Sequence, residues 1–252
     1  MQDQTLRKIA SSRLTLAAVV VRLLTYLLTV AVLWSYAAFG FAWADAASVY
    51  DAFILTVSDF RAIRHLIILT VVMALPVIAL VLVAANARSG KPLKGAGYAL
   101  LRADAILRMV VSAAGLVVSL IILSDSASPF AFSITAELIA MLLTSIAAAG
   151  ALKTARQIAV DGCTDRRLTY FLPITLILSF CVQAGNLIAV VLANYFPAPQ
   201  EVYRWYHTGL SPLDHLFVAA GAAGLVRTFL FLLLSLRAKK SLSQPRELLN
   251  DE

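Results

Sequence analysis

Residues 216–236 read LFVAAGAAGLVRTFLFLLLSL, a run of 21 residues in which Arg227 is the single charged side chain. A helix needs about 20 mostly apolar residues to cross roughly 30 Å of hydrocarbon. Lipid offers no partner to an unpaired backbone N–H or C=O, so an apolar run of this length is helical if it lies in a membrane. The segment therefore predicts a membrane-spanning helix that carries one cation.

The rest of the chain repeats this pattern. Of its 252 residues, 61% are apolar and 14% are charged, whereas a soluble domain carries about 25% charged residues. Six segments are long and apolar enough to span a bilayer: 16–38, 66–85, 106–124, 131–152, 172–193 and 216–236. The expected fold class is all-α, a polytopic integral membrane protein in which residues 1–252 form a single domain of six transmembrane helices.

The distribution of basic residues predicts how the chain is threaded. Sixteen of the 21 lysines and arginines fall in the N-terminal segment, in the second loop with the start of the helix that follows it (through Arg108), in the fourth loop, and in the tail at 237–252. Only Arg61, Arg64 and Arg204 fall in the loops of the other side. Since cytoplasmic loops are enriched in Lys and Arg, we expect both termini in the cytoplasm, with the protein in a bacterial inner membrane.

This topology also explains the net charge of +7. The excess of positive charge belongs to cytoplasmic segments facing anionic lipid, so the lipid bilayer is the expected partner and nucleic acid is not. The basic segments 88–108 and 153–167 can also dock a cytoplasmic or membrane protein. On the other side, residues 45–65 place apolar side chains at helical spacing, which fits either a helix lying flat on the outer surface or a packed loop.

No catalytic or metal-binding set emerges from the sequence. The two cysteines, Cys163 and Cys181, belong to no Cys/His cluster of the kind that binds zinc. Ser211 and Asp214 precede His215, but this run is typical of a helix start with Ser at the N-cap and Pro212 at the first helical position. We therefore name no catalytic residue and do not expect an enzyme.

Polar side chains inside the spans are the more informative candidates, since a charge within the membrane is costly and is a functional candidate by default. Arg227 lies near the centre of the sixth span, and Glu137 lies a little outward of the centre of the fourth. Gln183 and Asn186 are at similar depth in the fifth. We hypothesise an Arg227–Glu137 pair flanked by the two amides. Arg22, nearer the cytoplasmic side, is expected to extend to the headgroups.

This cluster supports two functions. In the first, the protein is a small-solute transporter or permease, where Arg227 binds an anionic group or gates a path and Glu137 neutralises it or carries a proton. In the second, the cluster only fixes helix packing. The protein is then a non-catalytic membrane subunit, or an accessory or assembly protein, that docks a partner through its basic cytoplasmic loops.

Two histidines provide one further hypothesis. His65 and His215 lie near the outer ends of the second and sixth spans, and so at similar depth. Two imidazoles in this arrangement can ligate a haem b from opposite sides. No other cofactor is expected from the sequence.

Overall fold

The structure, a computed structural model, describes residues 7–42, 60–90, 95–125, 129–161, 166–195 and 211–243. This part of the chain is built from six long helices, each apolar enough to cross a membrane. They are α2 (Arg13–Ala42), α4 (Phe60–Arg88), α5 (Ala96–Asp125), α6 (Pro129–Asp161), α7 (Arg166–Tyr195) and α9 (Ser211–Ser243). The protein is therefore an integral membrane protein of helical type, as its composition predicted.

Each predicted span lies within one of these helices, but several helices extend beyond it. The start of α5 at Ala96 lies ten residues before the predicted span, so Asp104 lies inside the helix together with Arg108. The end of α9 at Ser243 includes part of the predicted tail, whereas its start at Ser211 agrees with the predicted cap. The expected outer helix at 45–65 falls largely outside the described residues, since α4 begins at Phe60.

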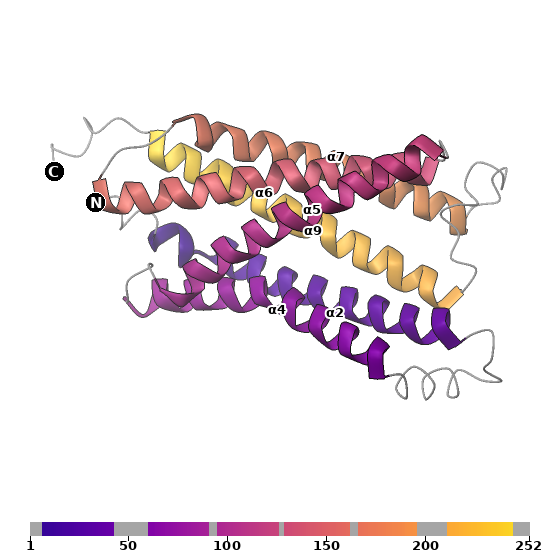
Figure 1. Ribbon diagram of the computed structural model, residues 1–252. Helices are drawn as coiled ribbons and strands as arrows, with labels where there is room; N and C mark the ends of the chain where they lie inside the picture. The colour runs from indigo at the N-terminus through magenta and orange to yellow at the C-terminus, as the bar shows by residue number, and fades with distance from the viewer. Residues whose placement is uncertain are drawn as a thin grey trace, which may run out of the picture.

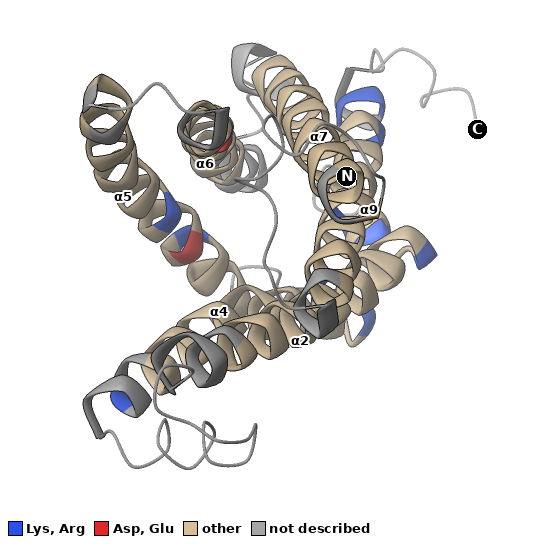
Figure 2. Cartoon of the chain, turned by 90° about the vertical axis from the view of Figure 1, so that its right-hand side faces the viewer, with Lys and Arg blue, Asp and Glu red and all other residues tan. Residues whose placement is uncertain are grey.

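The helices form a closed ring. The main packing contacts join α2 to α4, α4 to α5, α5 to α6, α6 to α7, α7 to α9 and α9 back to α2. Figure 2 shows this order from one end of the bundle. We use "terminal end" for the end at which α2 begins and α9 ends, and "far end" for the opposite one (Figure 1). In such a ring, residues on non-adjacent helices can meet only across the interior.

Helix α5 crosses the bundle diagonally, and two glycines allow its close approach to different neighbours (Figure 1). At Gly97 a side chain would lie 2.9 Å from the Ala79 carbonyl oxygen of α4. At Gly115, further along, it would lie 3.1 Å from Leu138 of α6. The helix is thus held against α4 near the terminal end and against α6 near the far end. Between these contacts it borders the interior of the ring.

Polar contacts between neighbouring helices are few and specific. The Trp34 indole N–H of α2 donates to the Thr70 hydroxyl of α4 at 3.0 Å. Near the terminal end, the Lys239 ammonium of α9 lies 3.8 Å from the centre of the Tyr170 ring of α7. Many other hydroxyls, such as that of Thr25, donate to a carbonyl one turn earlier on the same helix. These hydroxyls are therefore satisfied without a partner helix.

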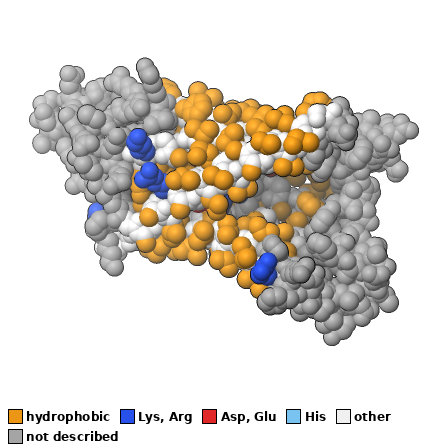
Figure 3. Space-filling view, in the orientation of Figure 1, with side chains coloured by type: hydrophobic (Ala, Val, Ile, Leu, Met, Phe, Trp, Pro, Cys, Tyr) orange, Lys and Arg blue, Asp and Glu red, His pale blue; other side chains and the backbone are white. Residues whose placement is uncertain are grey.

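The outer surface of the helices is apolar. Large hydrophobic side chains such as Val20, Val117 and Ile174 are more than half exposed. On the face shown in Figure 3, hydrophobic side chains cover most of the middle of the molecule and form an apolar belt. A soluble protein rarely leaves so large an apolar area open to solvent. The belt therefore fits a surface covered by lipid, and the interior of the ring becomes the place to look for a polar site.

Candidate functional site

A cavity of about 560 Å³ lies inside the ring and is lined by residues of all six helices. It reaches the terminal end, where Ile9 and Ala238 line it, and extends to the middle of the bundle at Gln183 and Arg227. Glu137, beyond the middle of α6, marks its far limit. The cavity therefore lies mainly in the terminal half of the bundle. Its volume is in the range of small-molecule sites, about 300–1,000 Å³.

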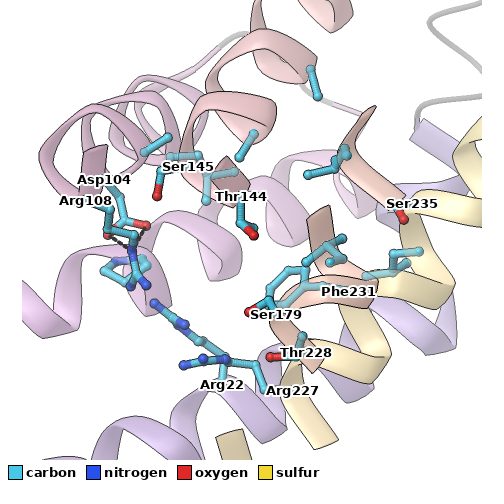
Figure 4. Close-up of a pocket in the computed structure, with 18 of the residues that line it drawn as sticks. Arg22, Asp104, Arg108, Thr144, Ser145, Ser179, Arg227, Thr228, Phe231 and Ser235 are labelled. Atoms are coloured by element: carbon cyan, nitrogen blue, oxygen red, sulfur yellow. Dashed lines mark hydrogen bonds and ion pairs between the residues drawn. The ribbon is translucent and has the colours of Figure 1, made fainter. Parts of the chain in front are cut away.

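Three arginines from three different helices point into this cavity. They are Arg22 of α2, Arg108 of α5 and Arg227 of α9 (Figure 4). Arg22 is only 8% exposed, and it lies within electrostatic range of the other two. Their like charges repel one another in a medium of low dielectric constant.

The arginines differ in their protein partners. Arg108 uses its Nε–H to reach both carboxylate oxygens of Asp104, one turn earlier, at 3.0 and 2.9 Å. Its two terminal amino groups donate to no residue in the described ranges. Arg22 and Arg227 form no hydrogen bond or ion pair with any described residue. Within this part of the chain, one cation of three is paired.

The cluster predicted from the sequence is divided between two hydrogen-bonding networks. In the first, Gln183 accepts a hydrogen bond from the Thr228 hydroxyl at 2.8 Å and donates to Ser179 at 3.2 Å. In the second, the Asn186 amide donates to Glu137 at 3.2 Å. Arg227, Glu137 and Gln183 line the same cavity, whereas Asn186 does not.

The direct Arg227–Glu137 ion pair is not formed among the described residues. Helix α7 packs between α6 and α9 in the ring, so it separates the helices that carry the two charges. Glu137 is instead bonded to Asn186, which also accepts a short hydrogen bond from the Ser133 hydroxyl. The two charges can therefore act on a common ligand from different sides of the cavity, but they do not neutralise each other by contact.

The sequence-based interpretation missed three members of the site. Asp104 and Arg108 were assigned to the cytoplasmic foot of the third span, yet both lie in α5 and line the cavity. Arg22 was expected to reach the headgroups, yet its side chain is buried in the interior. A signal for the first two existed, because an Asp and an Arg four residues apart can pair within a helix and need not end it.

The two histidines of the haem hypothesis are placed unequally. His215 of α9 contacts the Tyr195 hydroxyl of α7 through its Nδ1 atom, and the two rings are 5.4 Å apart between centroids. The side chain of His65 falls outside the described part of the structure, so the haem remains a prediction. Among the residues described, no group of three or more His, Cys, Asp or Glu side chains is arranged to hold a metal ion.

No family model, characterised protein or solved structure matches this chain. A function can therefore be proposed only from the cavity and its charged residues.

Proposed function

We propose that the protein is a permease-like transporter of a small solute, with the central cavity as its substrate site. The observation that supports this proposal is a cavity lined by all six helices that ends near the middle of the bundle. Substrate sites of secondary transporters lie near the bilayer midplane, at the junction of the moving parts. A cluster that served only to fix helix packing would have no need of a cavity of this size.

Features of the cavity wall fit a moving path. Pro76 lies inside α4 and lines the cavity, and a proline within a helix removes one hydrogen bond and allows bending. In the middle of the bundle, the hydrogen bond between Thr228 and Gln183 connects α9 to α7. Bending at α4 and separation at this contact would extend the cavity toward the far end. Glu137, at the far limit of the cavity, would balance the charge of Arg227 or carry a proton.

The charge distribution supplies the direction of the proposed transport path. If the basic segments face the cytoplasm, then the terminal end is cytoplasmic and the structure represents the state that is open to that side. The proposed location is a bacterial inner membrane. Solute bound at the arginines would cross when the cavity closes at the terminal end and opens at the far end.

Cysteine accessibility tests this proposal without knowledge of the substrate. In a chain whose Cys163 and Cys181 are replaced by serine, Ser179→Cys places a thiol on the cavity wall and Ile177→Cys places one on the exposed face of the same helix. Both variants are treated, in right-side-out and in everted membrane vesicles, with 2-sulfonatoethyl methanethiosulfonate, which does not cross membranes.

We expect Ser179→Cys to react in vesicles of both orientations, because alternating access exposes the cavity to each side in turn. Ile177→Cys should stay unreactive, since a lipid-facing thiol is not ionised. Reaction of Ser179→Cys from one side only would overturn the transport proposal and favour the accessory subunit. That alternative would then be pursued by identifying proteins that co-purify with the chain in mild detergent.

A further inference from the structure

The cavity lining holds more cations than anions among the described residues. Arg22 is nine-tenths buried and forms no hydrogen bond or ion pair with a described residue. Arg227 forms none there either, although Asp104 lies within electrostatic range of both arginines. The carboxylates in the lining, Asp104 and Glu137, are held by Arg108 and by Asn186 respectively. Three cations against two anions leave the lining with one positive charge in excess. Since uncompensated charge in a membrane interior is costly, the arrangement fits a site prepared for a negatively charged ligand.

The directions of approach indicate the kind of anion. Guanidinium groups arrive from three helices, α2, α5 and α9, and point into one space (Figure 4). Arginine favours oxyanions that accept two parallel hydrogen bonds. A carboxylate presents two oxygens in one plane, whereas a phosphate ester presents at least two charged oxygens and further acceptors in a tetrahedral arrangement. Convergence from three sides therefore matches a phosphate group better.

The remainder of the lining indicates what the phosphate is attached to. Away from the arginines, the wall is formed mostly by apolar side chains, among them Leu101, Leu172, Leu176, Phe231 and Leu234. Small residues of α6, such as Ala140 and Ala148, leave room beside them. A volume of about 560 Å³ greatly exceeds that of a phosphate ion and fits a ligand of drug-like size. Such a wall favours a hydrocarbon body over a sugar or a nucleotide.

We propose that the cavity binds an amphiphilic phosphate ester, with its phosphate between Arg22, Arg108 and Arg227 and its hydrocarbon body against the apolar wall. The ligand is either a phosphate-bearing lipid from the bilayer or a water-borne alkyl phosphate, which share this chemistry. The inference rests on the same cavity as the proposed transport function and names its ligand class. Binding does not depend on transport, so each can fail without the other.

The test measures binding to the full chain in a neutral maltoside detergent. The probe is dodecyl phosphate below its micellar concentration, compared with dodecyltrimethylammonium and inorganic phosphate at equal concentration. Binding is followed by native mass spectrometry and by the shift of the unfolding temperature. We expect dodecyl phosphate to bind one per chain and to stabilise the protein, and the other two probes to do neither.

Variants assign the binding to the arginines. Arg22→Gln, Arg108→Gln and Arg227→Gln should each weaken binding of dodecyl phosphate at least tenfold, and Arg22→Lys should retain part of it. Arg102→Gln on α5 and Arg237→Gln on α9 are matched controls, since both side chains are exposed and outside the cavity lining. They should bind as the unmodified chain does. Three arginine positions keep the test usable if one variant does not fold.

Other results would overturn the inference. Equal binding of inorganic phosphate would show a site for a free anion, and binding that survives all three glutamine substitutions would place the ligand elsewhere. Absence of dodecyl phosphate binding would also refute it. The source of the natural ligand is then decided with the protein in nanodiscs. Competition with dodecyl phosphate by phosphatidic acid, but not by phosphatidylcholine, indicates a lipid ligand, whereas no competition by either indicates a water-borne ester. Either result supports the shared chemistry, and the vesicle experiment with Ser179→Cys decides transport separately.

Discussion

Replacement of Asp104 by asparagine offers a sensitive test of the cavity as a charged compartment. The substitution removes the carboxylate that accepts both hydrogen bonds from the Arg108 Nε–H. It therefore raises the net charge of the lining from one positive charge to two. A sphere of 560 Å³ has a radius of about 5 Å, so a reagent inside lies about 5–8 Å from each lining charge.

The size of the effect follows from Coulomb's law. At an effective dielectric constant of about 20, one unit charge at about 5–8 Å contributes about 2–3 kcal/mol. Water in the mouth of the cavity screens part of this, so we expect about 1.4 kcal/mol, which is a tenfold change in rate. An anionic reagent should then react about tenfold faster and a cationic one about tenfold slower, which changes their rate ratio about 100-fold.

The assay compares two methanethiosulfonate reagents of similar size on the Ser179→Cys reporter. One carries a sulfonate and the other a trimethylammonium group, so steric effects cancel in their ratio of rates. Arg102→Gln, on α5 like Asp104, is the control, because the Arg102 side chain is exposed and does not line the cavity. If Asp104→Asn changes the ratio by less than about twofold while the thiol still reacts, the lining charges do not set the potential of the cavity and our reasoning is wrong.

Three further predictions concern stability and topology. Arg22→Leu should raise the unfolding temperature in detergent free of phosphate amphiphiles, because it removes a buried cation that forms no hydrogen bond or ion pair in the described chain. A lower unfolding temperature of the variant would reveal a stabilising protein partner of Arg22. Gly97→Ala should lower the unfolding temperature, since the new methyl group would lie 2.7 Å from Leu82 Cβ and 2.9 Å from the Ala79 oxygen. The control Gly185→Ala has nothing within 4 Å of the new methyl group and should leave the unfolding temperature nearly unchanged. Equal effects of the two substitutions would argue against the close α4–α5 contact. A C-terminal fusion to green fluorescent protein should fluoresce in a bacterial host and one to alkaline phosphatase should be inactive; the reverse pattern would contradict the cytoplasmic placement of the terminal end.

The helices were predictable from the sequence wherever the length and polarity of one segment are enough to make it a membrane span. Segments such as 172–193 and 216–236 appear within α7 and α9 because the length and polarity of each segment alone determine whether it can cross a bilayer. The beginning of α5 was not predictable to the same degree. The charges of Asp104 and Arg108 indicated a cytoplasmic loop and the first residues of the span. Because the two side chains pair with each other, both can lie inside the helix.

The candidate site was predictable only in part. Arg227, Gln183 and Glu137 were selected because a polar group within an apolar span is conspicuous, and all three line the cavity. The direct ion pair expected between Arg227 and Glu137 is not present among the described residues, and nothing in the sequence indicates that α7 separates α6 from α9. Arg22 was misjudged for a related reason. A long side chain near a helix end can extend to lipid or into the interior, and only the packing of α2 decides between them.

The sequence by itself determined that this protein spans a membrane as six helices, because hydrocarbon imposes the same length and backbone requirements on every span. It also identified Arg22, Glu137 and Arg227 as charged residues within the spans. The tertiary structure alone decided which charges meet. The closed ring turns Arg22, Arg108 and Arg227 toward one cavity from helices far apart in the chain, and this convergence depends on rotation and order of helices that local hydropathy does not encode.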